Sequence, residues 1–191
     1  MNVMPFEDLA VLSNRALEGI FRSAIMPPPE TLVSYEWRGY NIASFTRLLG
    51  IQKFIKGFFL LNGRVEGYNI QAQQNGLTEP WLYQPSAKTL KHYAFYVVTP
   101  VDPSSHDNLY PQALFLNYGA SPRNPRLAVE RPIRDYLAQP DPHNPNLLLG
   151  KAYLALGSCA SFPAFSSSNV CAVIIPKNSR TEIVHGYNRI Q

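Results

Sequence analysis

Prolines spread along nearly the whole chain are the feature that most constrains its fold. Seventeen prolines fall between Pro5 and Pro176. A proline inside a helix removes a backbone hydrogen bond and clashes with the preceding turn. The chain is therefore predicted to form short strands joined by turns, and a helical bundle is disfavoured.

The length of 191 residues suits one domain with a sizeable core. A hydrophobic content of 46% with 16% charged residues is typical of a folded protein, and 12% aromatic residues favour an aromatic-lined interior or cavity. We predict a single domain over 1–191, with an N-terminal helix in 1–25, a β-barrel in 26–165 and an atypical C-terminal tail in 166–191.

Charge and cysteine usage bear on partners and compartment. The net charge is +4, but the basic residues are scattered, so a nucleic-acid surface is not expected. Cys159 and Cys171 are expected to be free thiols, because no secretory signal precedes them. No apolar stretch reaches the roughly 20 residues of a membrane span, so we expect a cytoplasmic protein without membrane contact.

Two helices are predicted near the N-terminus. Apolar residues recur at spacings of three and four between Phe6 and Ile25, which predicts an amphipathic helix that packs as a lid on the domain. A second helix is predicted from Ser44, as its cap, through about Phe59.

Strand patterns occupy most of the remaining chain. The proline run Pro27–Pro29 delivers the chain extended to a strand in which Val33, Tyr35 and Trp37 share one face. The stretch 63–74 alternates without a purely apolar face, as a strand lining a semi-polar cavity would. Further strands are predicted at 79–83, 91–99, 113–118, 147–156, 170–175 and 182–187, and 135–137 is either a strand or one helical turn.

Several stretches together resemble a known family. Pro27-Pro28-Pro29-Glu30, Trp37-Arg38-Gly39 and Lys56-Gly57-Phe58-Phe59 resemble the short domain named for its G-x-W-x-G motif, with Tyr35 where the first glycine of the motif would be. Leu149-Gly150-Lys151-Ala152-Tyr153 and Phe162-Pro163-Ala164-Phe165 are similar to the closing strands of that family. The resemblance implies a mainly β fold, a lipocalin-like or calycin-like antiparallel β-barrel with one or two N-terminal helices and with Trp37 across its floor. The family has no established activity.

The tail departs from that family after Phe165, where Ser166-Ser167-Ser168-Asn169-Val170 replaces an aromatic and aliphatic strand. One inserted T would convert codons for this stretch into codons for the family-like sequence. A shifted reading frame after Phe165 is therefore a hypothesis, and an ordered barrel strand at 166–175 would argue against it.

Candidate site residues are mostly aromatic. The predicted ligand-binding residues are Trp37, Tyr68, Trp81, Tyr83, His92, Tyr96 and Tyr153, whose rings suit an apolar ligand with a polar end. His92 is expected to share a face with Tyr96, so these two are the candidate acid and base, although a structural role for His92 stays open. Four dispersed histidines and no close cysteine pair predict neither a metal site nor a cofactor.

These features support three functional hypotheses. The first is a barrel that binds a small hydrophobic molecule without chemistry of its own. The second is a cyclase or isomerase that uses the same cavity, with His92 and a tyrosine moving a proton. The third is an interaction module for a protein partner. The sequence leaves the ligand and the oligomeric state open.

Overall fold

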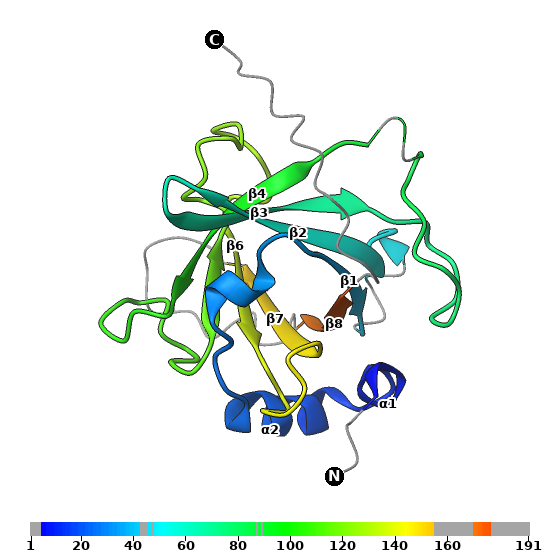
Figure 1. Cartoon of the computed structure of the whole chain (residues 1–191), viewed down its shortest axis with the longest axis horizontal. Coiled ribbons are helices and arrows are strands. Elements are labelled where there is room, and N and C mark those ends of the chain that lie inside the picture. The colour runs from blue at the N-terminus through cyan, green and yellow to red at the C-terminus, as the bar shows by residue number, and fades with distance from the viewer. Residues whose placement is uncertain are drawn as a thin grey trace.

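Eight antiparallel strands form a closed barrel in the computed structural model, which describes residues 5–42, 46, 48–86, 88, 90–154 and 170–176 (Figure 1). Each strand pairs with the next along the chain, and β1 pairs with β8 to close the barrel. The strands are β1 (Glu36–Asn41), β2 (Lys53–Leu61), β3 (Arg64–Gln71), β4 (Tyr93–Pro100), β5 (Leu114–Asn117), β6 (Ile133–Ala138), β7 (Leu148–Leu154) and β8 (Val170–Pro176). The helices are α1 (Phe6–Ala10), α2 (Asn14–Ser23) and the 3-10 helix η1 (Pro29–Leu32). The prediction of a mainly β fold is confirmed.

Most strands lie where the alternation of the sequence predicts them. The predictions for 63–74, 91–99, 113–118, 147–156 and 170–175 correspond to β3, β4, β5, β7 and β8. The open choice at 135–137 is settled as a strand, β6. The stretch 79–83 contributes a single bridge, between Ala72 and Tyr83. The prediction for 182–187 lies outside the described residues.

The predicted helix from Ser44 to Phe59 is wrong over its second half. Lys53–Leu61 forms β2, which pairs with β1 on one side and with β3 on the other. Its aromatic and β-branched side chains, Phe54, Ile55, Phe58 and Phe59, favour a strand. Its apolar residues happen also to recur at helical spacing, and pairing on both sides decides the outcome. Ser44 lies outside the described residues.

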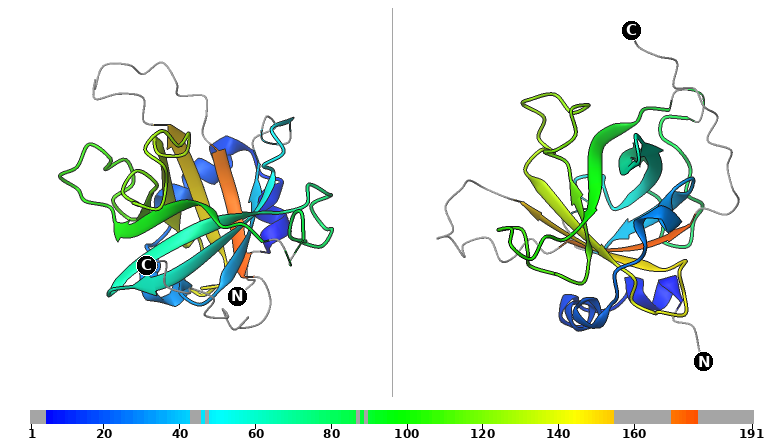
Figure 2. Two further views of the ribbon diagram at one scale, coloured as in Figure 1. Left: turned by 90° about the horizontal axis from the view of Figure 1, so that it is seen from above. Right: turned by 60° about the vertical axis from the view of Figure 1, so that its left-hand side comes forward.

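The predicted N-terminal helix is interrupted. α1 ends at Ala10 and α2 begins after Ser13, whose Oγ accepts a hydrogen bond of 3.3 Å from the backbone N–H of Ala16. Serine competes for backbone donors in this way and so favours a helix start over a helix interior. Both helices lie against the outer wall on one side of the barrel, as Figures 1 and 2 show from three directions. Leu9, Leu17 and Phe21 are fully buried there.

An ion pair holds α2 to the barrel. Lys151 of β7 donates to the carboxylate of Glu18 and, at 2.8 Å, to the hydroxyl of Tyr110. Burial acts to raise the pKa of Glu18, but the hydrogen bond and charge of Lys151 outweigh it, so that the pKa lies below its ordinary value. The Lys151 side chain is 1% exposed and therefore depends on Glu18 for its counter-charge.

We expect Glu18→Gln to lower the free energy of unfolding by about 1–3 kcal/mol, because it leaves a buried ammonium group without a charged partner. The measurement is urea denaturation followed by circular dichroism. Glu7→Gln, at an exposed position of α1, is the matched control and should change stability by less than about 0.5 kcal/mol. Equal effects of the two variants would contradict the role given to the ion pair.

Buried side chains inside the barrel form an apolar cluster that extends to the end where β1 begins. Leu32 of η1, Trp37, Phe58, Leu114 and Leu148 belong to it. The Trp37 indole N–H donates to the carbonyl of Leu32 at 3.3 Å, so that η1 is fixed to the barrel interior at this end. A second buried cluster lies on the outer wall and includes the apolar residues of both helices.

β8 completes the barrel beyond residue 165. Val170–Pro176 pairs with β7 through Leu148↔Ile174 and with β1 through Gly39↔Ile174. The shifted-frame hypothesis is weakened by this ordered strand. Residues 155–169 and 177–191 lie outside the described part of the chain, and with them the predicted thiol at Cys159.

Candidate functional site

A polar cluster lies inside the barrel, where an apolar core is the usual filling. Lys56 of β2 donates from Nζ to Asp135 Oδ2 at 3.1 Å, to the Tyr118 hydroxyl at 2.7 Å and to Asn69 Oδ1 at 3.0 Å. Tyr118 in turn donates to Asp135 Oδ2 at 2.7 Å. We call Lys56, Asn69, Tyr118 and Asp135 the interior cluster.

Strand alternation places each member of the interior cluster on the inner face. Lys56 lies midway between Phe54 and Phe58 on β2, and both of these rings are buried in the inner core. Asp135 precedes Leu137 by two residues on β6. Side chains two apart on a strand point the same way. The apolar neighbours therefore fix the direction of the charged residues.

Aromatic rings surround the ammonium group of Lys56. Its Nζ lies 4.7 Å from the ring centre of Tyr96, 5.3 Å from that of Tyr118 and 5.6 Å from that of Phe54. The Lys56 side chain is 6% exposed and that of Asp135 14% exposed. The second carboxylate oxygen, Asp135 Oδ1, is buried and has no hydrogen-bond partner among the described residues. Asp135 Oδ1 is therefore available to accept a hydrogen bond.

Burial shifts the pKa values of this cluster. It lowers the pKa of Lys56, against the opposing charge and hydrogen bond of Asp135. Burial also raises the pKa of Tyr96 and of Tyr118 well above the ordinary value, and the negative charge of Asp135 adds to the effect at both phenols. Both phenols therefore stay protonated, and available as donors, when exposed tyrosines ionise.

We expect stability to fall as the pH rises above 10, the ordinary pKa of tyrosine. Tyr96 and Tyr118 then ionise in the unfolded chain but not in the folded one, so the folded state binds more protons. Each contributes a loss of about 1.4 kcal/mol per pH unit until its folded pKa is reached. Urea denaturation across this range measures the slope, and Tyr118→Phe should reduce it. A slope that Tyr118→Phe leaves unchanged would contradict this account.

No protein-family model, no curated protein and no solved structure matches this chain. The interior cluster must therefore be interpreted from its own chemistry. Neither α1 nor α2, nor any other helix in the described part, has the length and apolar character that a membrane crossing requires. Among the described residues, histidine, cysteine and carboxylate side chains do not gather in groups of three or more that could hold a metal ion.

The aromatic residues predicted to bind a ligand do not line one common cavity. Trp37 and Tyr96 lie inside the barrel. Tyr68 and His92 stack on each other on the outer wall, with ring centres 3.9 Å apart, and Tyr83 donates to Glu36 at 2.5 Å. Trp81 packs against Phe6 of α1, and Tyr153 shares a hydrogen bond of 2.6 Å with Tyr110 beneath α2.

The structure does not bring His92 and Tyr96 together as an acid and a base. The pairing of β3 with β4 shifts between Gly67↔Tyr96 and Asn69↔Tyr93, so β4 carries one extra residue there. This bulge interrupts the alternation, and His92 contacts outward-facing Tyr68 instead of the interior. The expectation of a shared face for His92 and Tyr96 is therefore wrong, because it assumed an unbroken strand.

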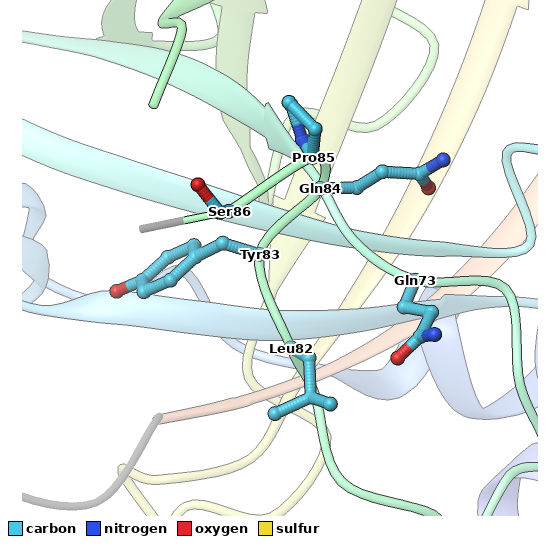
Figure 3. A pocket seen from close by; sticks show the side chains of 6 residues that line it. All are labelled: Gln73, Leu82, Tyr83, Gln84, Pro85 and Ser86. Atoms are coloured by element: carbon cyan, nitrogen blue, oxygen red, sulfur yellow. The ribbon is translucent and has the colours of Figure 1, made fainter. Parts of the chain in front are cut away.

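A surface hollow of about 570 Å³ lies on the outer wall after β3 (Figure 3). Gln73, Leu82, Tyr83, Gln84, Pro85 and Ser86 line it. Backbone hydrogen bonds from Gln73 to Leu82 and from Gln84 to Gln71 hold this ribbon. Tyr83 is the one ionisable side chain among these six lining residues, and its hydroxyl already donates a hydrogen bond to Glu36. The hollow therefore presents few groups that could bind or react with a polar ligand.

Sequence reasoning missed all four residues of the interior cluster. Lys56 falls within the stretch predicted as a helix, and that prediction hid its place between two inward phenylalanines. Asp135 was noted only as part of a short element of undecided type. The sequence did contain a signal. If Phe54-Ile55-Lys56-Gly57-Phe58 is interpreted as a strand, the charged Lys56 lies on the same face as the aromatic rings of Phe54 and Phe58.

Proposed function

We propose that this chain binds a small hydrophobic molecule inside its barrel, with the polar group of that molecule held by Lys56 and Asp135. One observation carries the proposal. Asp135 Oδ1 is buried beside a buried ammonium group and has no hydrogen-bond partner among the described residues. A ligand hydroxyl that donates to this oxygen would satisfy it.

The energetic cost of the interior cluster supports a role beyond stability. Removing two charges from water costs several kcal/mol per ion, and well-packed apolar residues often serve a core equally well. Charged groups with perturbed pKa values inside a protein gather at functional sites more than elsewhere. The surrounding rings of Phe54, Tyr96 and Tyr118 offer apolar contact for the rest of the ligand.

The ligand would enter at the end of the barrel away from η1. Trp37, Phe58 and Leu114 belong to the apolar cluster at the η1 end. Lys56 precedes Phe58 on β2, and Tyr118 follows Leu116 beyond β5, so both lie further toward the opposite end. A molecule entering there would reach Phe54 and the interior cluster before Trp37, Phe58 and Leu114.

The finer expectations from sequence belong to the same proposal. They are a lipocalin-like barrel of the G-x-W-x-G type, a cytoplasmic location, and binding without catalysis. In such a barrel Trp37 would be the tryptophan of the motif, and its indole is fixed to η1.

Thermal denaturation with a series of ten-carbon compounds tests the proposal. Decanol should stabilise the wild-type protein, because a ligand at about 100 times its Kd adds about 2.7 kcal/mol, and decane should stabilise it less. Lys56→Met combined with Asp135→Leu removes the acceptor for the decanol hydroxyl and should abolish the preference for decanol over decane. Leu82→Ser, which alters the surface hollow, is the matched control and should retain it. Absence of any stabilisation, or loss of the preference in Leu82→Ser alone, would overturn the proposal.

A further inference from the structure

We propose that Lys56 forms a reversible imine with an aldehyde carried by an apolar molecule, which makes the barrel a covalent binder of aliphatic aldehydes. This inference rests on the proposed function, since the aldehyde must first enter the interior. It assigns to Lys56 a reaction in addition to a hydrogen bond.

The contacts of Lys56 suit this reaction. An amine attacks a carbonyl only in its neutral form, so a neighbouring group must take its proton. Asp135 Oδ2 lies 3.1 Å from Nζ and is positioned to accept that proton. Burial lowers the pKa of Lys56, which increases the neutral fraction. Exposed lysines such as Lys88 and Lys91 lack this environment.

The reaction balances without an added reagent. Lys56 passes one proton to Asp135, and the neutral amine adds to the aldehyde carbon to give a carbinolamine. Asp135 then returns its proton to the carbinolamine hydroxyl, which leaves as water. The product is a protonated imine paired with the Asp135 carboxylate, so total charge is unchanged.

Two further features favour the intermediate and the product. Asp135 Oδ1 has no hydrogen-bond partner within the described part of the chain and can accept a hydrogen bond from the carbinolamine hydroxyl. Tyr118 donates to Asp135 Oδ2 at 2.7 Å and so holds the carboxylate in place. The aromatic surroundings limit access of water, which would hydrolyse the imine.

Reductive trapping tests the inference directly. The native protein is incubated with decanal and sodium cyanoborohydride, and the modified lysines are identified by peptide mass spectrometry. We expect Lys56 to be labelled faster than Lys91, and this order to disappear in the urea-unfolded chain. Asp135→Asn should slow labelling of Lys56 by about 100-fold, the usual contribution of a proton-transfer group.

Variants separate the reaction from folding and from simple binding. Lys56→Arg keeps the positive charge beside Asp135 but cannot form an imine, so it should lose the fast label while remaining folded. Lys91→Arg is the matched control and should keep it. If decanol stabilises the protein but decanal does not label Lys56 preferentially, the imine is overturned and the proposed function stands. If neither compound acts, both are overturned.

Discussion

Lys56→Met is expected to lower the free energy of unfolding by about 3–5 kcal/mol. Methionine matches lysine in length and fills the same space among the rings of Phe54, Tyr96 and Tyr118. The loss therefore comes from Asp135, which keeps its charge in the interior without the ammonium group 3.1 Å away. Burial of an unpaired carboxylate is costly.

A double variant distinguishes this cause from a packing defect. Lys56→Met combined with Asp135→Leu removes both charges, so the double variant should be more stable than Lys56→Met alone. Urea denaturation of the wild type, both single variants and the double variant gives the coupling energy. Additive losses would show that the two groups do not depend on each other, contrary to the contacts described above.

Gly67→Ala is expected to lower the free energy of unfolding by about 3 kcal/mol, at the upper end of the usual cost of overpacking. A Cβ at this position would lie 2.2 Å from the Tyr96 ring and 2.6 Å from the backbone oxygen of Gly57. Tyr96 cannot move aside easily, because it is fully buried and its hydroxyl donates to that same Gly57 oxygen at 3.1 Å. The strain would fall on β2, β3 and β4 together.

Gly19→Ala is the matched control for Gly67→Ala. A Cβ at Gly19 meets no atom within 4 Å, and the residue lies inside α2. Alanine there should raise stability by about 0.5–1 kcal/mol through its better helix propensity. Thermal and urea denaturation of both variants measure the contrast. Tolerance of alanine at Gly67 would mean that the ring of Tyr96 is less constrained than its contacts indicate.

Local sequence patterns predicted most strands because each one carries its own evidence. Val97 and Val98, or Leu114 and Leu116, alternate or cluster in a way that favours strands whatever lies beside them. The stretch around Lys56 satisfies both a helical and an extended spacing, and pairing with Trp37 and Asn69 decides between them. Strand pairing is a tertiary interaction, so it cannot be predicted from the sequence of one segment alone.

The interior cluster could not be predicted from the sequence for a related reason. Its members come from β2, β3, β6 and the end of β5, and Lys56 and Asp135 are 79 residues apart in the chain. No short motif can signal contacts of this kind. The prediction for His92 was wrong for a different reason. A bulge lies beside Ala94, whose φ is 46°, and it reverses the side-chain direction that simple alternation predicts. The one extra residue in β4 places the His92 side chain on the outer side of the barrel wall.

The position of β8 makes the barrel dependent on the far end of the chain. β8 lies between β1 and β7, so it covers the backbone donors and acceptors of both neighbours. A chain truncated before Val170 would leave those two strands as open edges. Unpaired edges recruit strands from other molecules, so β8 protects the protein from self-association as well as enclosing its interior.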